Sequence, residues 1–429
     1  MDMPLIPVPP GLQTELFCLG KDALRYLPDV LKRAFPGRKP FLAADGNTWR
    51  VAGERAEALL AAAGLPPVGK HVFPGTPRLH PDYRYCEELA AEFPADCVPV
   101  AVGSGVVNDL VKCGASLKDL AYCCVPTACS VDGYTSAGAA LGVNGMKTTV
   151  KCPAPKAICA DTDILATAPP EMFASGYADL LAKVPAGADW VIADALGVEP
   201  IRRDVWDLIQ GNIRRWLADP HDMGAVFDGL AATGYSMQMY LDSRPASGAE
   251  HMFSHIWEME GLTFKGEDVS HGFKVGIGSL AVTLLMEYML DFSFDELAPR
   301  MKPGLTPEAR AAEVAELLKR GCYGDQYPAI AMKKFLYGDA LAARRERIRQ
   351  VWEPMRRGVR ERLIPYPELV KIMHSAGCPV RPAEIGLGRE QFLHGVRTAQ
   401  VTRPRYTILD LLYELGVFED AIRRLDIML

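Results

Sequence analysis

The chain has 429 residues, of which 49% are hydrophobic and 23% charged, so it can bury one or more sizeable cores. Its formal net charge of −6 argues against nucleic-acid binding, which requires a basic surface. The sequence shows no uninterrupted apolar run of about 18 residues and no basic and apolar leader at its start. We therefore expect a cytoplasmic protein without a membrane span.

The first 165 residues alternate short apolar runs with helical segments. The runs "RKPFLAADG" (38–46), "DCVPVAVGSG" (96–105) and "AYCCVPTACS" (121–130) are typical of buried strands. Between them, "ERAEALLAAAGL" (54–65) and "VVNDLVKCGASL" (106–117) are typical of helices. This alternation predicts βαβ units and a largely parallel sheet, in a Rossmann-like α/β domain. A hairpin-like excursion within 145–165 precedes a further strand.

The eleven cysteines lie mainly in apolar stretches and lack the paired CxxC spacing of zinc ribbons. We expect buried, reduced thiols, as in cytosolic proteins. Disulfides and a thiolate metal site are the alternatives.

A glycine turn joins the predicted strand at 96–103 to the following helix. Gly103 and Gly105 would allow backbone N–H groups to approach a dinucleotide pyrophosphate, or would simply form a tight turn. Asp45 ends an earlier strand, where it would accept hydrogen bonds from an adenosine ribose or cap a turn. A carboxylate there disfavours a 2′-phosphate, so NAD is expected over NADP.

A polar run follows the buried strand at 121–126. It contains Thr127, Ser130, Asp132, Thr135 and Ser136. The carboxyl ends of parallel strands open onto the ligand crevice, so these hydroxyls would face a bound cofactor and Asp132 would bind a substrate hydroxyl. A simple polar turn is the alternative.

The character of the sequence changes after residue 167. Pro169 and Pro170 suit a helix start, and apolar residues then recur every three to four positions almost to the end of the chain. We therefore predict an NAD(P)-binding α/β domain over 1–167 and an all-α metal- and substrate-binding domain over 168–429.

Histidines and one aspartate in the helical part suggest a metal site. His251 and His255 share a helix face, and His271 opens a further helix with a glycine beside it. The HExxH motif of zinc proteases is absent, because Met252 follows the first histidine. Asp179 would add a carboxylate, and one carboxylate with two imidazoles suits Zn²⁺, Ni²⁺ or Fe²⁺. Structural roles for these histidines are the alternative.

Five motifs together resemble one enzyme family. The segments "GSGVVNDLVK", "VPTACSVDGYTS", "SGYADLLAK", "SGAEHMFSH" and "SHGFKVG" resemble, in order and spacing, sn-glycerol-1-phosphate dehydrogenases. These belong to the superfamily of iron-type alcohol dehydrogenases, glycerol dehydrogenase and dehydroquinate synthase. The segment "RPRYTILDLLYELG" (403–416) looks like the bacterial branch. The resemblance covers about residues 40 to 415 and implies a dehydroquinate synthase-like fold.

The resemblance implies roles for individual cofactor-site residues, with Asp45 at the adenosine ribose. The residues implied to hold the dinucleotide phosphates are Gly103, Ser104, Gly105, Val106 and Val107. Those implied to contact the nicotinamide half are Thr127, Ala128, Cys129, Ser130 and Ser136. The phosphate loop departs from the family pattern, with "GSG" in place of "GGG".

It also implies a catalytic centre. Asp179, His251 and His271 match the metal ligands, and Asp179 would also touch substrate together with Asp132. His255 matches a substrate-site histidine outside the metal shell and would relay a proton through water. Lys183 stands where iron-type alcohol dehydrogenases carry another metal-binding histidine. It would bind the substrate phosphate or only pair with Asp179.

The implied activity is metal-dependent reduction of dihydroxyacetone phosphate to sn-glycerol 1-phosphate by NAD(P)H, in a homodimer. The partner is then a small phosphorylated substrate. Three alternatives remain: a glycerol or polyol dehydrogenase that needs no phosphate, a dehydroquinate synthase-like lyase, and a non-catalytic NAD- or metal-sensing protein.

Overall fold

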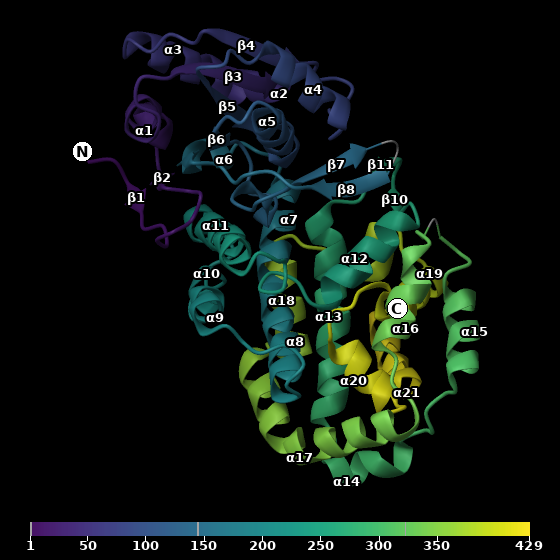
Figure 1. Ribbon diagram of the computed structural model, residues 1–429. Coiled ribbons are helices and arrows are strands. Elements are labelled where there is room, and N and C mark those ends of the chain that lie inside the picture. The colour runs from purple at the N-terminus through teal and green to yellow at the C-terminus, as the bar shows by residue number, and fades with distance from the viewer. Residues whose placement is uncertain (1, 144–145, 322) are drawn as a thin grey trace. The chain divides into compact units, whose positions relative to one another are not determined.

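The computed structural model describes residues 2–143, 146–321 and 323–429, which form two compact units (Figure 1). The first unit runs to Leu180 and resumes from Arg214 to Asp242. The second comprises Leu181–Ile213 and Ser243–Leu429. We describe each unit by itself, and the predicted domain boundary after residue 167 stays a prediction.

The first unit is built on a mostly parallel sheet, which confirms the predicted α/β class. The described strands of this sheet are β1 (Leu5–Ile6), β2 (Leu16–Gly20), β3 (Lys39–Asp45), β4 (Gly69–Phe73), β5 (Cys97–Gly103), β6 (Cys123–Pro126) and β9 (Ala157–Asp161). Their order across the sheet is β1-β2-β9-β6-β5-β3-β4. Strand β1 pairs with β2 antiparallel, and all the other neighbours pair in parallel.

Helices cover both faces of this sheet, which explains why the central strands β5, β6 and β9 are buried along their whole length, whereas the edge strand β4 alternates. On one face, Leu42 of β3 belongs to a core with Leu31 and Leu60. On the other, Phe41 packs edge-on against Phe93, with ring centroids 5.2 Å apart. The helices of this unit are α1 (Leu27–Ala34), α2 (Gly46–Thr48), α3 (Glu54–Ala62), α4 (Tyr83–Glu92), α5 (Gly105–Leu117), α6 (Thr162–Leu165), α7 (Pro170–Leu181), α10 (Ile213–Trp216) and α11 (Met223–Tyr240). The last residue of α7 and the first residue of α10 already belong to the second unit.

A helix from later in the chain completes the first unit. Phe227 of α11 packs against Phe17 of β2 and Tyr134, with ring centroids 6.1 and 5.4 Å away. The Thr135 hydroxyl also donates to the carbonyl of Ala231, at 2.7 Å. These contacts explain why 214–242 returns to the α/β unit although its periodicity is that of the helical part.

The excursion between α5 and β9 includes an antiparallel hairpin, β7 (Ala139–Val143) and β8 (Met146–Val150). The expected excursion therefore begins earlier than residue 145, which itself lies outside the described residues. The ten cysteines that the structure describes are buried thiols, as expected, while Cys322 lies outside the described residues.

The second unit is helical apart from a two-stranded hairpin, β10 (Thr263–Phe264) and β11 (Glu267–Asp268). Its helices are α8 (Lys183–Ala195), α9 (Arg203–Gln210), α12 (Ala249–Met259), α13 (His271–Leu290), α14 (Phe294–Leu297), α15 (Pro307–Leu317), α16 (Gln326–Lys334), α17 (Gly338–Arg362), α18 (Tyr366–Ser375), α19 (Arg389–Thr402), α20 (Ile408–Glu414) and α21 (Phe418–Ile422).

The core of this unit is organised around α13. Among the described residues, α13 is long and apolar enough to cross a membrane, but 83% of its most apolar 18-residue stretch is buried within the protein. It is therefore the central helix of the unit. Buried Asp189 of α8 fixes two further helices, because its carboxylate accepts from the backbone N–H of Ala249 (2.8 Å) and of Ile408 (2.7 Å). Each of these contacts satisfies an N–H group at a helix start that has no partner within its own helix.

Candidate functional site

The glycine turn forms a strand–turn–helix unit, as the sequence predicts. Strand β5 ends at Gly103 and helix α5 begins at Gly105. A Cβ atom on Gly103 would lie 2.4 Å from the Cβ of Val107, so only glycine lets the helix start this close to the strand. Ser104 precedes the helix, and its side chain makes no capping hydrogen bond. The first N–H groups of α5 are therefore suited to an anion.

The Asp45 carboxylate caps the short helix α2. Its Oδ1 accepts from the backbone N–H of Asn47 at 2.8 Å and of Thr48 at 3.0 Å. The capping role considered for this residue is thus present. Its predicted contact with a ribose stays a prediction.

The polar run after β6 is held close to the glycine turn. The Thr127 N–H donates to the carbonyl of Gly103 at 3.1 Å, so the carboxyl ends of β5 and β6 are joined. The Tyr134 hydroxyl donates to the Ala128 carbonyl at 2.6 Å and lies 3.2 Å from the Ser130 hydroxyl. Cys129 is fully buried, and a Cβ on Gly176 of α7 would lie 2.2 Å from its carbonyl oxygen. The loop is therefore rigidly packed, with Ser130 already engaged.

The second half of this loop carries Asp132 and Ser136. The Ser136 hydroxyl donates to the Gly133 carbonyl at 3.1 Å, and the buried Lys112 ammonium donates to the same carbonyl at 3.0 Å. The backbone N–H of Asp132 donates to Oδ2 of Asp179 at 2.9 Å. The structure thus brings together two residues that the family resemblance assigns to substrate.

The three histidines gather on two adjacent helices of the second unit. His251 and His255 lie on α12, and His271 is the first residue of α13. The ring of His271 lies 5.3 Å from that of His251 and 6.4 Å from that of His255, between centroids. The two helices approach this closely because Gly278 of α13 faces the backbone of Glu250.

Glutamates precede and follow the histidine pair, and the first of them orients an imidazole. Nδ1 of His251 lies 2.9 Å from Oε1 of Glu250. With Nδ1 donating to this carboxylate, Nε2 is the ring nitrogen that would bind a metal. Glu258 lies 3.7 Å from Nδ1 of both His255 and His271, and its Oε1 forms a 2.7 Å ion pair with Lys274.

The sequence analysis predicts no role for Glu250, Glu258 or Lys274. The two glutamates stand next to His251 and three residues after His255, and Lys274 stands three residues after His271. Residues three positions apart lie on one helix face, so the sequence could have predicted that Glu258 lies beside His255 and Lys274 beside His271. The pairing of Glu258 with Lys274 across two helices was not readable from either helix alone.

The electrostatics of the histidine cluster favour neutral imidazole at His255. Desolvation lowers the pKa of this side chain and the attraction of Glu258 opposes the shift, while 39% of the side chain stays exposed to solvent. A neutral imidazole can both accept and donate a hydrogen bond, as a proton relay requires.

Asp179 and Lys183 stand at the end of α7 and the start of α8, which are separated by Ala182. Both side chains are fully buried. Their proposed pairing, like the phosphate contact of Lys183, stays a prediction. Asp179 of the first unit and His251 and His271 of the second are a carboxylate and two imidazoles, donors of the kinds that bind divalent metals.

Comparisons with known proteins agree with this chemistry. Residues 18–169 match the family model described as iron-containing alcohol dehydrogenase. The chain is 30% identical to a glycerol-1-phosphate dehydrogenase [NAD(P)+] of Bacillus subtilis, over 94% of this chain and 92% of the relative. It is 33% identical to one of Methanoculleus marisnigri, over 62% of this chain and 74% of the relative.

Among solved structures, a glycerol dehydrogenase from Schizosaccharomyces pombe shares the fold. It aligns with a TM-score of 0.60 at 16% sequence identity, and the alignment covers 100% of this chain and 92% of the other. Identity this low supports the architecture alone.

Proposed function

Because the chain belongs to the glycerol-1-phosphate dehydrogenase family, we propose that it reduces dihydroxyacetone phosphate to sn-glycerol 1-phosphate. It is an NAD(P)-dependent oxidoreductase of the iron-containing alcohol dehydrogenase type. The observation that carries this proposal is the alignment with the Bacillus subtilis relative, which spans 94% of the chain and includes both units.

The cofactor is proposed to bind at the carboxyl ends of β5 and β6. The N–H groups that open α5 would bind the pyrophosphate, and the loop from Thr127 to Ser136 would contact the nicotinamide half. Asp45 supports a preference for NAD(H) over NADP(H), because its carboxylate would repel a 2′-phosphate.

The donor set fits a divalent metal. Asp179, His251 and His271 would supply one carboxylate and two imidazoles, and with Nδ1 of His251 donating to Glu250, Nε2 would be the ligand atom of that ring. A divalent metal at these residues would supply Lewis-acid polarisation of the substrate ketone. Zn, Ni and Fe all accept such ligands, and the proposal does not choose between them.

The protein residues supply orientation and the proton. Asp132 and Asp179 would hold substrate hydroxyls, and the 2.9 Å hydrogen bond from the Asp132 N–H to the Asp179 carboxylate supports a shared role. His255, as a neutral imidazole, would relay a proton from solvent water to the substrate oxygen, accepting one proton at one ring nitrogen while it gives up another. Lys183 is proposed to hold the substrate phosphate.

The test is to follow oxidation of NADH and of NADPH with dihydroxyacetone phosphate after loading the protein with Zn, Ni or Fe. We expect turnover, faster with NADH, and a product that is the sn-1 enantiomer by chiral analysis. Equal turnover of unphosphorylated dihydroxyacetone would instead indicate a polyol dehydrogenase. Release of inorganic phosphate would indicate a lyase, and no turnover with any metal would indicate a sensing protein.

We further propose a cytoplasmic homodimer, on the basis of the family resemblance and the buried thiols. Light scattering of the purified protein would give the mass of the assembly. A mass equal to one 46.9 kDa chain would refute the dimer.

A further inference from the structure

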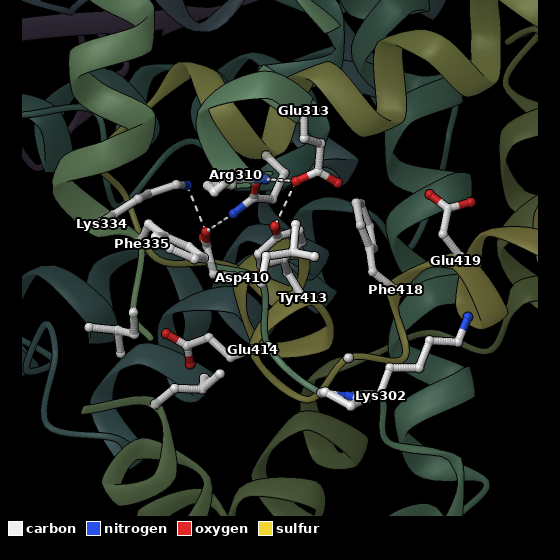
Figure 2. A pocket seen from close by; sticks show the side chains of 17 residues that line it. Lys302, Arg310, Glu313, Lys334, Phe335, Asp410, Tyr413, Glu414, Phe418 and Glu419 are labelled. Carbon is white, nitrogen blue, oxygen red and sulfur yellow. Dashed lines mark hydrogen bonds and ion pairs between the residues drawn. The ribbon is translucent and has the colours of Figure 1, made fainter. Parts of the chain in front are cut away.

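A cavity of about 160 Å³ lies in the second unit, away from the two helices that carry the histidines (Figure 2). It is bordered by α15, α16, α20, α21 and the loop before α15. Its volume is close to the ~150 Å³ of an engineered cavity that binds benzene. A molecule with about six non-hydrogen atoms would fill it.

The wall of the cavity is partly apolar and partly charged. The apolar part includes Leu305, Phe335 and Phe418. The charged part includes three cationic residues, Lys302, Arg310 and Lys334, and four carboxylates. A ligand for this cavity is therefore a small molecule with one polar end and one apolar end.

Three of the four carboxylates already have cationic partners. Glu313 forms a 2.6 Å ion pair with Arg310, and Asp410 lies 2.6 Å from Lys334. Glu419 accepts hydrogen bonds from Nε (2.8 Å) and Nη2 (2.7 Å) of Arg397. Their negative charge is therefore compensated before any ligand binds.

Two of the cations keep unused donors. The Arg310 guanidinium is almost completely buried between the rings of Phe335 and Tyr413, with its carbon 5.8 and 4.3 Å from their centroids. Its Nε is buried and has no hydrogen-bond partner among the described residues. Nζ of Lys334 is also buried; it forms the 2.6 Å ion pair with Asp410, and among the described residues its other N–H groups have no acceptor. Buried donors of this kind are unusual and are normally satisfied by protein, water or ligand.

Lys302 and Glu414 are the third cation and the fourth carboxylate of the cavity wall. Lys302 lies in the loop before α15 with 60% of its side chain exposed, and its nearest acid is Asp420 at 3.9 Å. Glu414 accepts a 2.5 Å hydrogen bond from Tyr406. Burial raises the pKa of Glu414 to about 7, so much of it is neutral at physiological pH. With Glu414 neutral, the three cations of the wall balance its three other carboxylates, and Arg397 adds a further cation beside Glu419.

We propose that this cavity is a binding site for a small organic anion, with a carboxylate or phosphate at the cationic wall and a short apolar chain against Leu305, Phe335 and Phe418. The anion would accept from Arg310 and Lys334, and Lys302 would attract it at the entrance. This site is separate from the proposed catalytic centre and does not depend on the proposed reaction.

Binding to the full-length protein can be measured by ligand-observed NMR and calorimetry with four probes. Butyrate and butyl phosphate carry the two candidate head groups, butylamine reverses the charge and butanol removes it. We expect butyrate or butyl phosphate to bind, with the tighter of the two identifying the head group. Equal or tighter binding of butylamine or butanol would overturn the proposal.

Two exposed positions allow the site to be changed without disturbing the core. Lys302→Glu should weaken binding of the anions about three- to tenfold, as expected for reversal of one exposed charge. Lys371→Glu, at an exposed lysine of α18, is the control and should not change it. Leu305→Trp should abolish binding by filling the cavity from a side chain that is 39% exposed, whereas Val198→Trp, 41% exposed, should not.

The pH dependence of butyrate binding is a second, independent test. Glu414 is surrounded by Tyr406, Arg344, Asp410 and Lys334, and it loses its proton near pH 7. Butyrate, which stays ionised, should bind about tenfold more weakly at pH 8 than at pH 6, and Glu414→Gln should remove this difference. Unchanged binding in both Lys302→Glu and Leu305→Trp would place the anion elsewhere and refute the site.

Discussion

Alanine at Gly278 would place a methyl group 2.6 Å from the carbonyl oxygen of Glu250, the residue next to His251. A normal contact is about 3.5 Å, so α12 and α13 would have to separate by roughly 0.5–1 Å. Such overpacking costs about 1–3 kcal/mol, and the better helix propensity of alanine returns about 0.5–1 kcal/mol. We expect Gly278→Ala to lower the free energy of unfolding by about 1–2 kcal/mol.

The same separation would disturb the histidine cluster, because His251 and His271 lie on the two helices that move. Urea denaturation followed by circular dichroism gives the stability, and elemental analysis after dialysis against equal metal gives the occupancy. Both should fall. The matched control is Gly224→Ala in α11, where the nearest atom to the new Cβ is 3.4 Å away, an ordinary contact, so its stability should hold or rise. A Gly278→Ala protein as stable and as metal-loaded as Gly224→Ala would refute this account of the helix packing.

Three further predictions address the catalytic centre and the fold. His251→Ala should empty the metal site, whereas His255→Ala should keep the metal and lose rate; elemental analysis showing the reverse would exchange their roles. Lys183→Ala should raise the KM for dihydroxyacetone phosphate about ten- to a hundredfold with metal content unchanged, because a charge-assisted contact is worth about 1.5–3 kcal/mol. An equal effect on unphosphorylated dihydroxyacetone would make this lysine purely structural. The pKa of Glu414 is raised in the fold, so its contribution to stability is complete below about pH 4.5 and is lost as pH rises through about 7, by at most about 3 kcal/mol. Glu414→Gln should therefore flatten the fall in unfolding free energy between pH 5 and pH 8, and an unchanged slope in denaturation curves would contradict this.

Local sequence determined the elements of the first unit and the position of its glycine turn. A continuous apolar run before Gly103 and a helical pattern after Gly105 specify strand, turn and helix without knowledge of the rest of the chain. The spacing of His251 and His255 likewise places both on one helix face. These features depend on residues within about one helix of each other, so periodicity alone was sufficient.

Tertiary structure decided which helix belongs to which core. Helix α11 is apolar on nearly all its faces, so its sequence predicts a buried helix but does not show which element it packs against. The contacts of Phe227 with Phe17 and Tyr134 assign this helix to the sheet. The pairing of Glu258 with Lys274, and of Arg310 with Gln400 ninety positions later, is equally invisible in local pattern. Ion pairs and buried hydrogen bonds between distant segments depend on how helices pack, and helix periodicity carries no information about the identity of the neighbour.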